Sequence, residues 1–154
     1  MKNENEGNDK NELIALGCDH GGFSLMESIR AHFNAKNIKY IDFGVSSESP
    51  VDYPLIAERV TDAILTGKCG KGILTCGTGI GMCMAANRKK GIRAALCHDT
   101  FSARMTRLHN DANILTMGGR VIAAGLAIEI TETFLSTPFS GEERHANRIK
   151  MMDE

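Results

Sequence analysis

The chain has 154 residues, of which 42% are hydrophobic, and its formal net charge at pH 7 is −1. This length predicts one domain with a substantial core, and the charge lacks the basic footprint of a nucleic-acid-binding protein. No apolar run approaches the ~20 residues that a membrane-spanning helix needs. Residues 1–12 are polar and lack the apolar core of a signal peptide. We therefore expect a disordered tail over 1–12, a single domain over 13–154 and a cytoplasmic protein.

Apolar strands alternate with amphipathic helices along the rest of the chain. The patterns predict strands over 13–18, 38–43, 72–76, 92–97 and 113–117. They predict helices over 23–36, from a cap at Asp52 through Ile64, from about 82 to 87, and over 101–108, 121–135 and 143–152. Such alternation is typical of βαβ units. We expect an α/β fold: a three-layer α/β/α sandwich around a five-stranded, parallel, doubly wound (Rossmann-like) sheet.

The strand order sets where a ligand would bind. With the order 2-1-3-4-5, the direction of winding reverses between the first and third strands, and ligands bind outside the carboxyl ends of the strands there. Those two strands end at Asp19-His20 and at Cys76. We therefore expect a site at this edge of the sheet.

The stretch that begins at Cys76 has the most distinctive local chemistry. Gly77, Gly79 and Gly81 follow the cysteine at alternate positions, and a helix then begins. A glycine loop at a helix start aims N–H groups and the positive end of the helix dipole at an anion, and a thiol there is acidified. We interpret Cys76 as a base or nucleophile, with a packed core thiol as the alternative. The glycine spacing differs from a dinucleotide fingerprint, and a tight turn without ligand stays open.

The other chemistry-bearing residues are histidines, arginines and cysteines. His20, His98 and His109 are expected at or beyond the carboxyl ends of strands, on one rim. Arg144 and Arg148 lie four apart and share a helix face, either as a phosphate grip or as a solvated basic face. The five cysteines have neither disulfide nor zinc spacing, which predicts reduced thiols, and no cluster is typical of a metal site. A base, a histidine acid and a phosphate grip together indicate isomerisation of a sugar phosphate.

Six stretches in order resemble the ribose-5-phosphate isomerase B family, which includes the galactose-6-phosphate isomerase subunits. They are Gly17-Cys18-Asp19-His20-Gly21-Gly22, Asp52-Tyr53-Pro54, Cys76-Gly77-Thr78-Gly79-Ile80-Gly81, Gly91-Ile92-Arg93-Ala94, Arg107-Leu108-His109-Asn110-Asp111-Ala112-Asn113 and Arg144-His145-Ala146-Asn147-Arg148. The resemblance runs from about residue 13 to the end. It implies a cofactor-free aldose–ketose isomerase that interconverts ribose 5-phosphate and ribulose 5-phosphate in the pentose phosphate pathway.

The resemblance also implies roles for individual residues. Cys76 matches the base that moves a proton between C1 and C2, and His109 matches the acid that opens the furanose ring. Thr78 and the amides of Gly77, Gly79, Ile80 and Gly81 match the group that stabilises the enediolate. The remaining matches are sugar- and phosphate-binding positions: Asp19, His20, Asn110, Arg120, Arg144 and Arg148. The family forms dimers or tetramers with sites at the dimer interface, so we expect a homo-oligomer with the C-terminal helix at that interface.

Three alternatives remain at the level of sequence. His98 adjoins the expected site and is a second candidate for ring opening. The substrate could be a hexose 6-phosphate, such as allose or galactose 6-phosphate. The chain could also be a sugar-phosphate-binding regulator, which would keep the arginines and the glycine loop but would not need Cys76.

Overall fold

The computed structural model describes residues 13–154, so the tail expected over residues 1–12 lies outside the described residues. The strands are β1 (Ile14–Cys18), β2 (Tyr40–Asp42), β3 (Lys71–Cys76), β4 (Ala94–Leu96) and β5 (Ile114–Gly118). The helices are α1 (Phe23–Lys36), α2 (Tyr53–Leu65), α3 (Ile80–Ala86), α4 (Thr100–Asn110), α5 (Ala124–Ser136) and α6 (Glu143–Asp153). The described strands form one parallel sheet, which confirms the predicted α/β fold.

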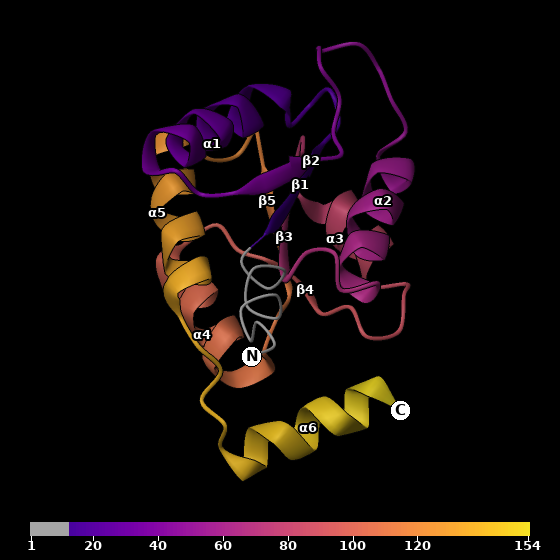
Figure 1. Ribbon diagram of the computed structural model, residues 1–154, viewed down its shortest axis with the longest axis vertical. Coiled ribbons are helices and arrows are strands. Elements are labelled where there is room, and N and C mark those ends of the chain that lie inside the picture. Colours follow the sequence, from indigo (N-terminus) through magenta and orange to yellow (C-terminus); the bar gives the residue numbers. More distant parts are fainter. Residues whose placement is uncertain (1–12) are drawn as a thin grey trace, which may run out of the picture.

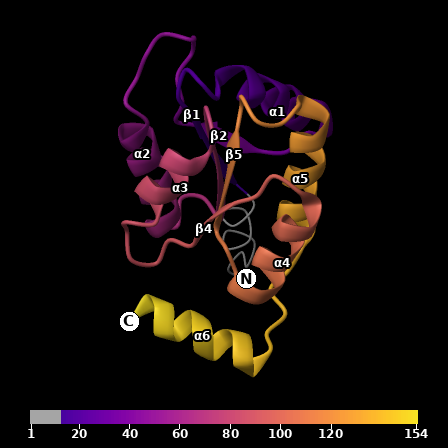
Figure 2. The same cartoon turned by 180° about the vertical axis from the view of Figure 1, so that it is seen from behind.

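Two layers of helices cover the sheet, as Figure 1 shows with α1, α4 and α5 on one side and α2 and α3 on the other. Each face of the sheet packs into its own apolar core. Phe33 and Phe134 belong to the core under α1, α4 and α5, and Ile56 and Met82 belong to the core under α2 and α3. The view from behind shows that α6 joins neither layer and crosses the end of the molecule instead (Figure 2).

The strand order is β2-β1-β3-β5-β4, so the order 2-1-3-4-5 considered from the sequence is wrong at its last two positions. Burial explains the difference. All five residues of β5 are buried, whereas the three residues of β4 are only partly buried. A strand that is apolar on both faces gains most in the interior of a parallel sheet, and a short strand suits the edge. The reversal of winding between β1 and β3 is retained, and the end of β5 now lies beside the end of β3.

Most predicted elements lie within a few residues of their expected bounds. Helix α1 spans residues 23–36 as predicted, and α3 begins directly after the glycine loop at Ile80. Asp52 holds the N-cap position of α2, but its side chain makes no capping hydrogen bond. The strand expected over residues 92–97 is reduced to three residues, although the Cys97 N–H still donates to the Thr116 carbonyl at 3.2 Å.

Candidate active site

Cys76 is the last residue of β3, and its side chain points into the turn that follows. The thiol is 4% exposed, and the Gly79 N–H donates to its Sγ at 3.1 Å. Gly79 has a φ of +79°, in the left-handed region that favours glycine. This backbone conformation curls the loop back over the sulfur. The Ile80 N–H donates to Thr78 Oγ1 at 3.3 Å, which leads the chain into α3.

The N–H groups of Gly77 and Thr78 are the free donors of the loop. Within residues 13–154 neither group donates a hydrogen bond. The absence of a side chain at Gly77 lets Arg120 approach the loop. A Cβ at this position would lie 3.2 Å from Arg120 Nη1. The loop therefore presents two unused amide donors, and Gly77 lies beside the Arg120 guanidinium; such groups are suited to a developing oxyanion.

Tyr53 also faces this loop, although the sequence pattern did not predict it as a site residue. A Cβ on Gly81 would lie 2.7 Å from the Tyr53 ring, so the absence of a side chain at Gly81 lets the ring pack against the loop. Tyr53 is 39% exposed. The Asp52-Tyr53-Pro54 stretch is the one sequence feature that could have pointed to Tyr53 as a site residue. The same stretch is also typical of an ordinary helix start, so it did not single out Tyr53.

Asp19 and His20 lie in the turn after β1, next to the glycine loop. The Asp19 N–H donates to the Thr75 carbonyl at 3.2 Å, and its carboxylate accepts the Gly22 N–H at 3.1 Å. A Cβ on Gly21 would lie only 2.9 Å from the Gly77 nitrogen. His20 Nδ1 accepts the Val51 N–H at 3.4 Å. The turn after β1 therefore packs directly against the turn after β3, as expected where the winding reverses.

His98 follows β4 at the same edge of the sheet. Its Nε2 accepts the Gly118 N–H at 3.0 Å, and Gly118 is the β5 partner of Cys76. Burial lowers the pKa of His98, because it disfavours the imidazolium, and the nearby Asp99 carboxylate works in the opposite direction. The imidazole is thus held as an acceptor at Nε2, which makes His98 a poor proton donor at that atom.

His109 does not lie on this rim, and that expectation was wrong. It sits in the last turn of α4, which runs back from the carboxyl edge of the sheet to the amino edge. The residues just after α4 mark this edge, since the Gly72 N–H at the start of β3 donates to the Asn113 carbonyl at 2.9 Å. Cys76 ends β3 four residues after Gly72, about 13 Å along the strand. His109 and Cys76 of one chain therefore belong to opposite edges.

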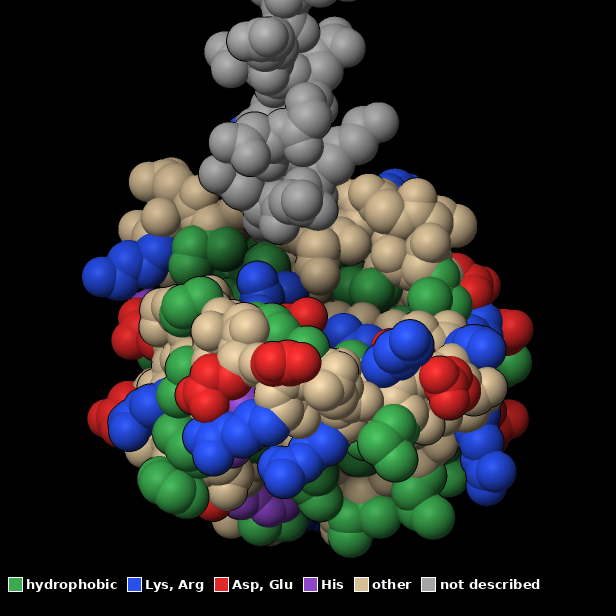
Figure 3. All heavy atoms as spheres, turned by 90° about the horizontal axis from the view of Figure 1, so that it is seen from below, with side chains coloured by type: hydrophobic (Ala, Val, Ile, Leu, Met, Phe, Trp, Pro, Cys, Tyr) green, Lys and Arg blue, Asp and Glu red, His purple; other side chains and the backbone are tan. Residues whose placement is uncertain are grey.

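A second cluster forms around His109. Its ring stacks on that of His145 in α6, with centroids 4.3 Å apart and an interplanar angle of 16°. Burial, helped by the neighbouring His109 and Arg144, lowers the pKa of His145. Arg144 and Arg148 are exposed on the same helix, and Arg144 Nε pairs with Glu142 at 2.8 Å. Looking onto the end crossed by α6, Figure 3 shows Lys and Arg side chains gathered with acidic ones and histidine among them.

The predicted site residues thus fall into two groups. We call the group at the carboxyl edge the cysteine half-site: Asp19, His20, Cys76, Gly77, Thr78, Gly79, Ile80, Gly81 and Arg120. We call the group at the amino edge the arginine half-site: His109, Asn110, Arg144 and Arg148. Each half-site is assembled within one chain, and the chain does not bring the two together.

The remaining cysteines fit a structural role. All five are free, as predicted. Burial raises the pKa of Cys18 and Cys69, and together with the Asp99 carboxylate it raises the pKa of Cys97 to about 12. Across residues 13–154 there is no group of three or more His, Cys, Asp or Glu side chains placed to hold a metal ion. The same residues include no helix with the length and apolarity to cross a bilayer.

Comparison with known proteins decides the family. The family model described as Ribose/Galactose Isomerase matches residues 14–152. The chain belongs to this family. The crystal structure of a ribose 5-phosphate isomerase from Thermotoga maritima is 50% identical and superposes with a TM-score of 0.90, covering 92% of this chain and 97% of that one.

Relatives in the ribose/galactose isomerase family differ in the substrate that their names give. The ribose-5-phosphate isomerase B of Escherichia coli is 42% identical over 89% of this chain and 91% of its own. The D-erythrulose-4-phosphate isomerase of Pectobacterium atrosepticum is also 42% identical, over 83% of this chain and 85% of its own. These relatives support a sugar phosphate isomerase, and their names give different sugars as the substrate.

Proposed function

We propose that the protein is an aldose–ketose isomerase that interconverts ribose 5-phosphate and ribulose 5-phosphate, without a cofactor, at sites shared by two copies of the chain. The observation that carries this proposal is the division of its chemistry between opposite edges of the sheet. The cysteine half-site holds a thiol beside unused amide donors, and the arginine half-site holds a stacked imidazole and two exposed arginines. These are complementary parts of one reaction.

The cysteine half-site is suited to proton transfer between C1 and C2. Cys76 would remove the proton from the carbon beside the carbonyl and return it to the neighbouring carbon. The enediolate that forms in between carries its charge on oxygen, where preorganised N–H donors lower the barrier. The unused Gly77 and Thr78 amides would supply those donors, and the Arg120 guanidinium beside Gly77 supports this role. A positioned base typically contributes about 10²–10⁴-fold.

The arginine half-site is suited to phosphate binding and ring opening. Arg144 and Arg148 on one face of α6 can grip a phosphate with paired hydrogen bonds. His109 in the same cluster would donate the proton that opens the furanose. The Nε2 of His98 is already an acceptor for the Gly118 N–H, which favours His109 over His98 as that acid. In a homodimer, the second copy would supply this half-site to the cysteine half-site of the first.

The choice of sugar is tested by comparing substrates. Pure enzyme should give its highest kcat/KM with ribose 5-phosphate, against erythrulose 4-phosphate, allose 6-phosphate and galactose 6-phosphate. A higher kcat/KM with any of the other three would replace the proposed substrate, and binding of all four without turnover would favour the regulator. Activity should also survive dialysis against a chelator with no cofactor added. On this proposal the enzyme serves the pentose phosphate pathway in the cytoplasm.

A further inference from the structure

Arg93 carries the most connected side chain at the amino edge of the sheet. It precedes β4, and its side chain is 18% exposed. Its Nε donates to the carbonyls of Asn110 at 3.0 Å and Asp111 at 3.2 Å. Its Nη2 lies 3.4 Å from the Asp111 carboxylate, and its Nη1 donates to Asp153 at 2.9 Å. One planar guanidinium thus joins the end of α4 to the end of α6.

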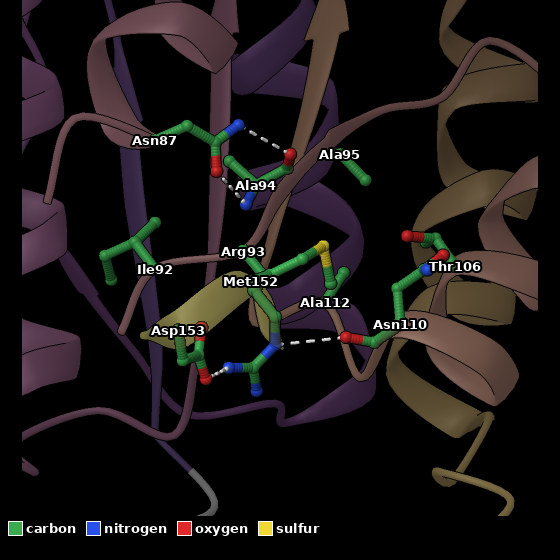
Figure 4. A pocket seen from close by; sticks show the side chains of 10 residues that line it. All are labelled: Asn87, Ile92, Arg93, Ala94, Ala95, Thr106, Asn110, Ala112, Met152 and Asp153. Carbon is green, nitrogen blue, oxygen red and sulfur yellow. Dashed lines mark hydrogen bonds and ion pairs between the residues drawn. The ribbon is translucent and has the colours of Figure 1, made fainter. Parts of the chain in front are cut away.

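The two segments that Arg93 joins are the two that carry the arginine half-site. Asn110 and its neighbour His109 are the last residues of α4, and Asp153 is the last residue of α6. Figure 4 shows the Arg93 side chain between Asn110 and Asp153, at a cavity of about 430 Å³ that Met152 also lines. The cavity leaves α6 little packing against the body of the protein at this end, so the polar tie is its main anchor there.

Helix α6 is held near both ends and by little between them. Near its start, His145 is 5% exposed and stacks on His109. Asp153 lies eight residues further on, about 12 Å along the helix axis. The segment before α6 does little to fix the direction of the helix. It contains Gly141, which has a φ of +71° and no packing neighbour within 4 Å of its Cβ position. The stack and the Arg93–Asp153 pair therefore fix the axis of α6.

We propose that Arg93 is a positioning residue for the arginine half-site, which sets where Arg144 and Arg148 stand relative to His109 and Asn110. The inference rests on the proposed function for the identity of that half-site. A phosphate does not react during isomerisation, so misplacing the arginines that hold it weakens ground state and transition state alike. Such a loss raises KM and leaves kcat nearly unchanged.

Two variants separate the two sets of contacts that Arg93 makes, one arm to Asp153 in α6 and one arm to the end of α4. Asp153→Asn weakens only the arm to α6, and we expect KM to rise about 5- to 10-fold with kcat within about twofold. Arg93→Lys keeps the charge but loses the planar fork, so it releases both arms. We expect it to raise KM at least as far and also to lower kcat, because His109 and Asn110 lose their support. Adding Asp153→Asn to Arg93→Lys should change KM little further, since the shared contact is already lost.

Lys90→Ala is the matched control. Lys90 also reaches the end of α6, where its Nζ donates to the Glu154 carbonyl at 3.4 Å, but this contact is exposed and does not involve Arg93. It should leave KM and kcat within about twofold of the unmodified enzyme. An unchanged KM in Asp153→Asn, or an equal rise in Lys90→Ala, would overturn the proposal. A lower melting temperature with no change in KM would do the same, because it would show a purely structural role.

A substrate-independent measurement keeps this inference apart from the proposed function. Hydrogen exchange of the amides in residues 143–153 should be about fivefold faster in Asp153→Asn than in the unmodified chain, and unchanged in Lys90→Ala. Inorganic phosphate should bind more weakly to Asp153→Asn. If the unmodified enzyme does not turn over ribose 5-phosphate but both results hold, the proposed substrate fails and the role of Arg93 stands. If neither result holds, Arg93 does not position α6.

Discussion

At the scale of single residues, the five cysteines of this chain differ by their surroundings. Cys69 and Cys76 belong to the same segment of chain, one just before β3 and one at its end, and both are buried. Only the Cys76 sulfur receives an N–H from a glycine loop, at 3.1 Å. Burial alone makes a thiol a packing group, and Cys18 and Cys83 also accept side-chain hydrogen bonds, from Arg30 and Asn87. The position of Cys76 at the glycine loop is therefore what supports its proposed role as the base.

This difference predicts the behaviour of two alanine variants. Cys76→Ala should lower kcat for sugar phosphate isomerisation by about 10²–10⁴-fold or more, because a positioned base is removed, while a sugar phosphate still binds. Cys69→Ala is the control at the other end of the strand and should keep kcat within about twofold. Steady-state kinetics together with binding calorimetry measure both. A near-normal kcat in Cys76→Ala would exclude its role as the base.

His98 predicts a dependence of stability on pH. Its pKa is lowered in the folded protein, so the unfolded chain, with a pKa of about 6.5, binds a proton more readily. The contribution of neutral His98 is therefore complete above about pH 6.5 and is lost as the pH falls towards the folded pKa. The pKa of His145 is also lowered in the folded protein, so its effect on stability has the same sign.

The test is urea unfolding at pH 7.5, 6.5 and 5.5. The free energy of unfolding should fall with acidification. His98→Gln keeps an acceptor for the Gly118 N–H but has no proton to gain, so its free energy of unfolding should fall less steeply. The same slope in variant and unmodified chain would show that His98 does not contribute.

At the scale of elements, the turn from β3 into α3 depends on close backbone approach. Gly79 combines a φ of +79° with crowding, since a Cβ there would lie 2.6 Å from Leu96 Cδ1 and 2.8 Å from the Met117 carbonyl carbon. Neither the strained conformation nor the contact admits a larger residue. The loop can curl over Cys76 only because a glycine occupies this position.

Replacing two glycines tests this account. Gly79→Ala should destabilise the fold by at least about 1–3 kcal/mol, the cost of a left-handed residue alone, and should lower activity by disturbing the loop. Gly125→Ala is the control, because Gly125 lies in α5 with no atom within 4 Å of its Cβ position. It should stabilise by about 0.4–1 kcal/mol. Unfolding midpoints in urea compare the two, and equal effects would contradict the close-approach argument.

At the scale of the whole molecule, the two half-sites face opposite ends of one chain. Figure 1 shows α6 across one end, while β5 runs towards the other end, where α1 begins. Residues 137–142 connect α5 to α6 with little burial. Two hydrogen bonds tie this segment to α4: the Thr137 carbonyl accepts Arg107 Nε at 3.2 Å, and the Ser140 N–H donates to the Leu108 carbonyl at 3.1 Å. A two-fold dimer can place the arginine half-site of each copy against the cysteine half-site of the other.

Mixing two inactive variants tests this arrangement. Cys76→Ala damages one half-site, and Arg144→Ala/Arg148→Ala damages the other. After mixing, unfolding and refolding, about half of the dimers are hybrids, each with one doubly defective site and one intact site. Roughly a quarter of the unmodified activity should return.

The matched control pairs Cys76→Ala with Arg120→Ala. Both changes lie in the cysteine half-site, so no hybrid site is intact and no activity should return. If the first pair also recovers nothing, with hybrids confirmed by mass spectrometry, the arginines act in the same chain as the cysteine that they serve.

The sequence by itself determined most of the elements and the glycine loop of this protein. Helix α1, the strand that ends at Cys76 and the glycine turn after it follow from local periodicity and turn chemistry, which are written in neighbouring residues. The family resemblance added the roles of Cys76, His109 and the arginines as predictions. For features that depend only on neighbouring residues, the sequence was sufficient to predict the structure.

The tertiary structure decided what depends on residues far apart in the chain. The insertion of β5 between β3 and β4 reflects competition for the buried centre of the sheet, which no single segment encodes. The same competition places the end of β5, with Gly118, beside Cys76. The packing of Tyr53 on Gly81 and the bonds from Arg93 to α4 and α6 join residues that are 17 to 60 positions apart. His109 lies at the amino edge because α4 must run the length of the sheet before β5 begins, and only the packed helix shows which edge its last turn reaches.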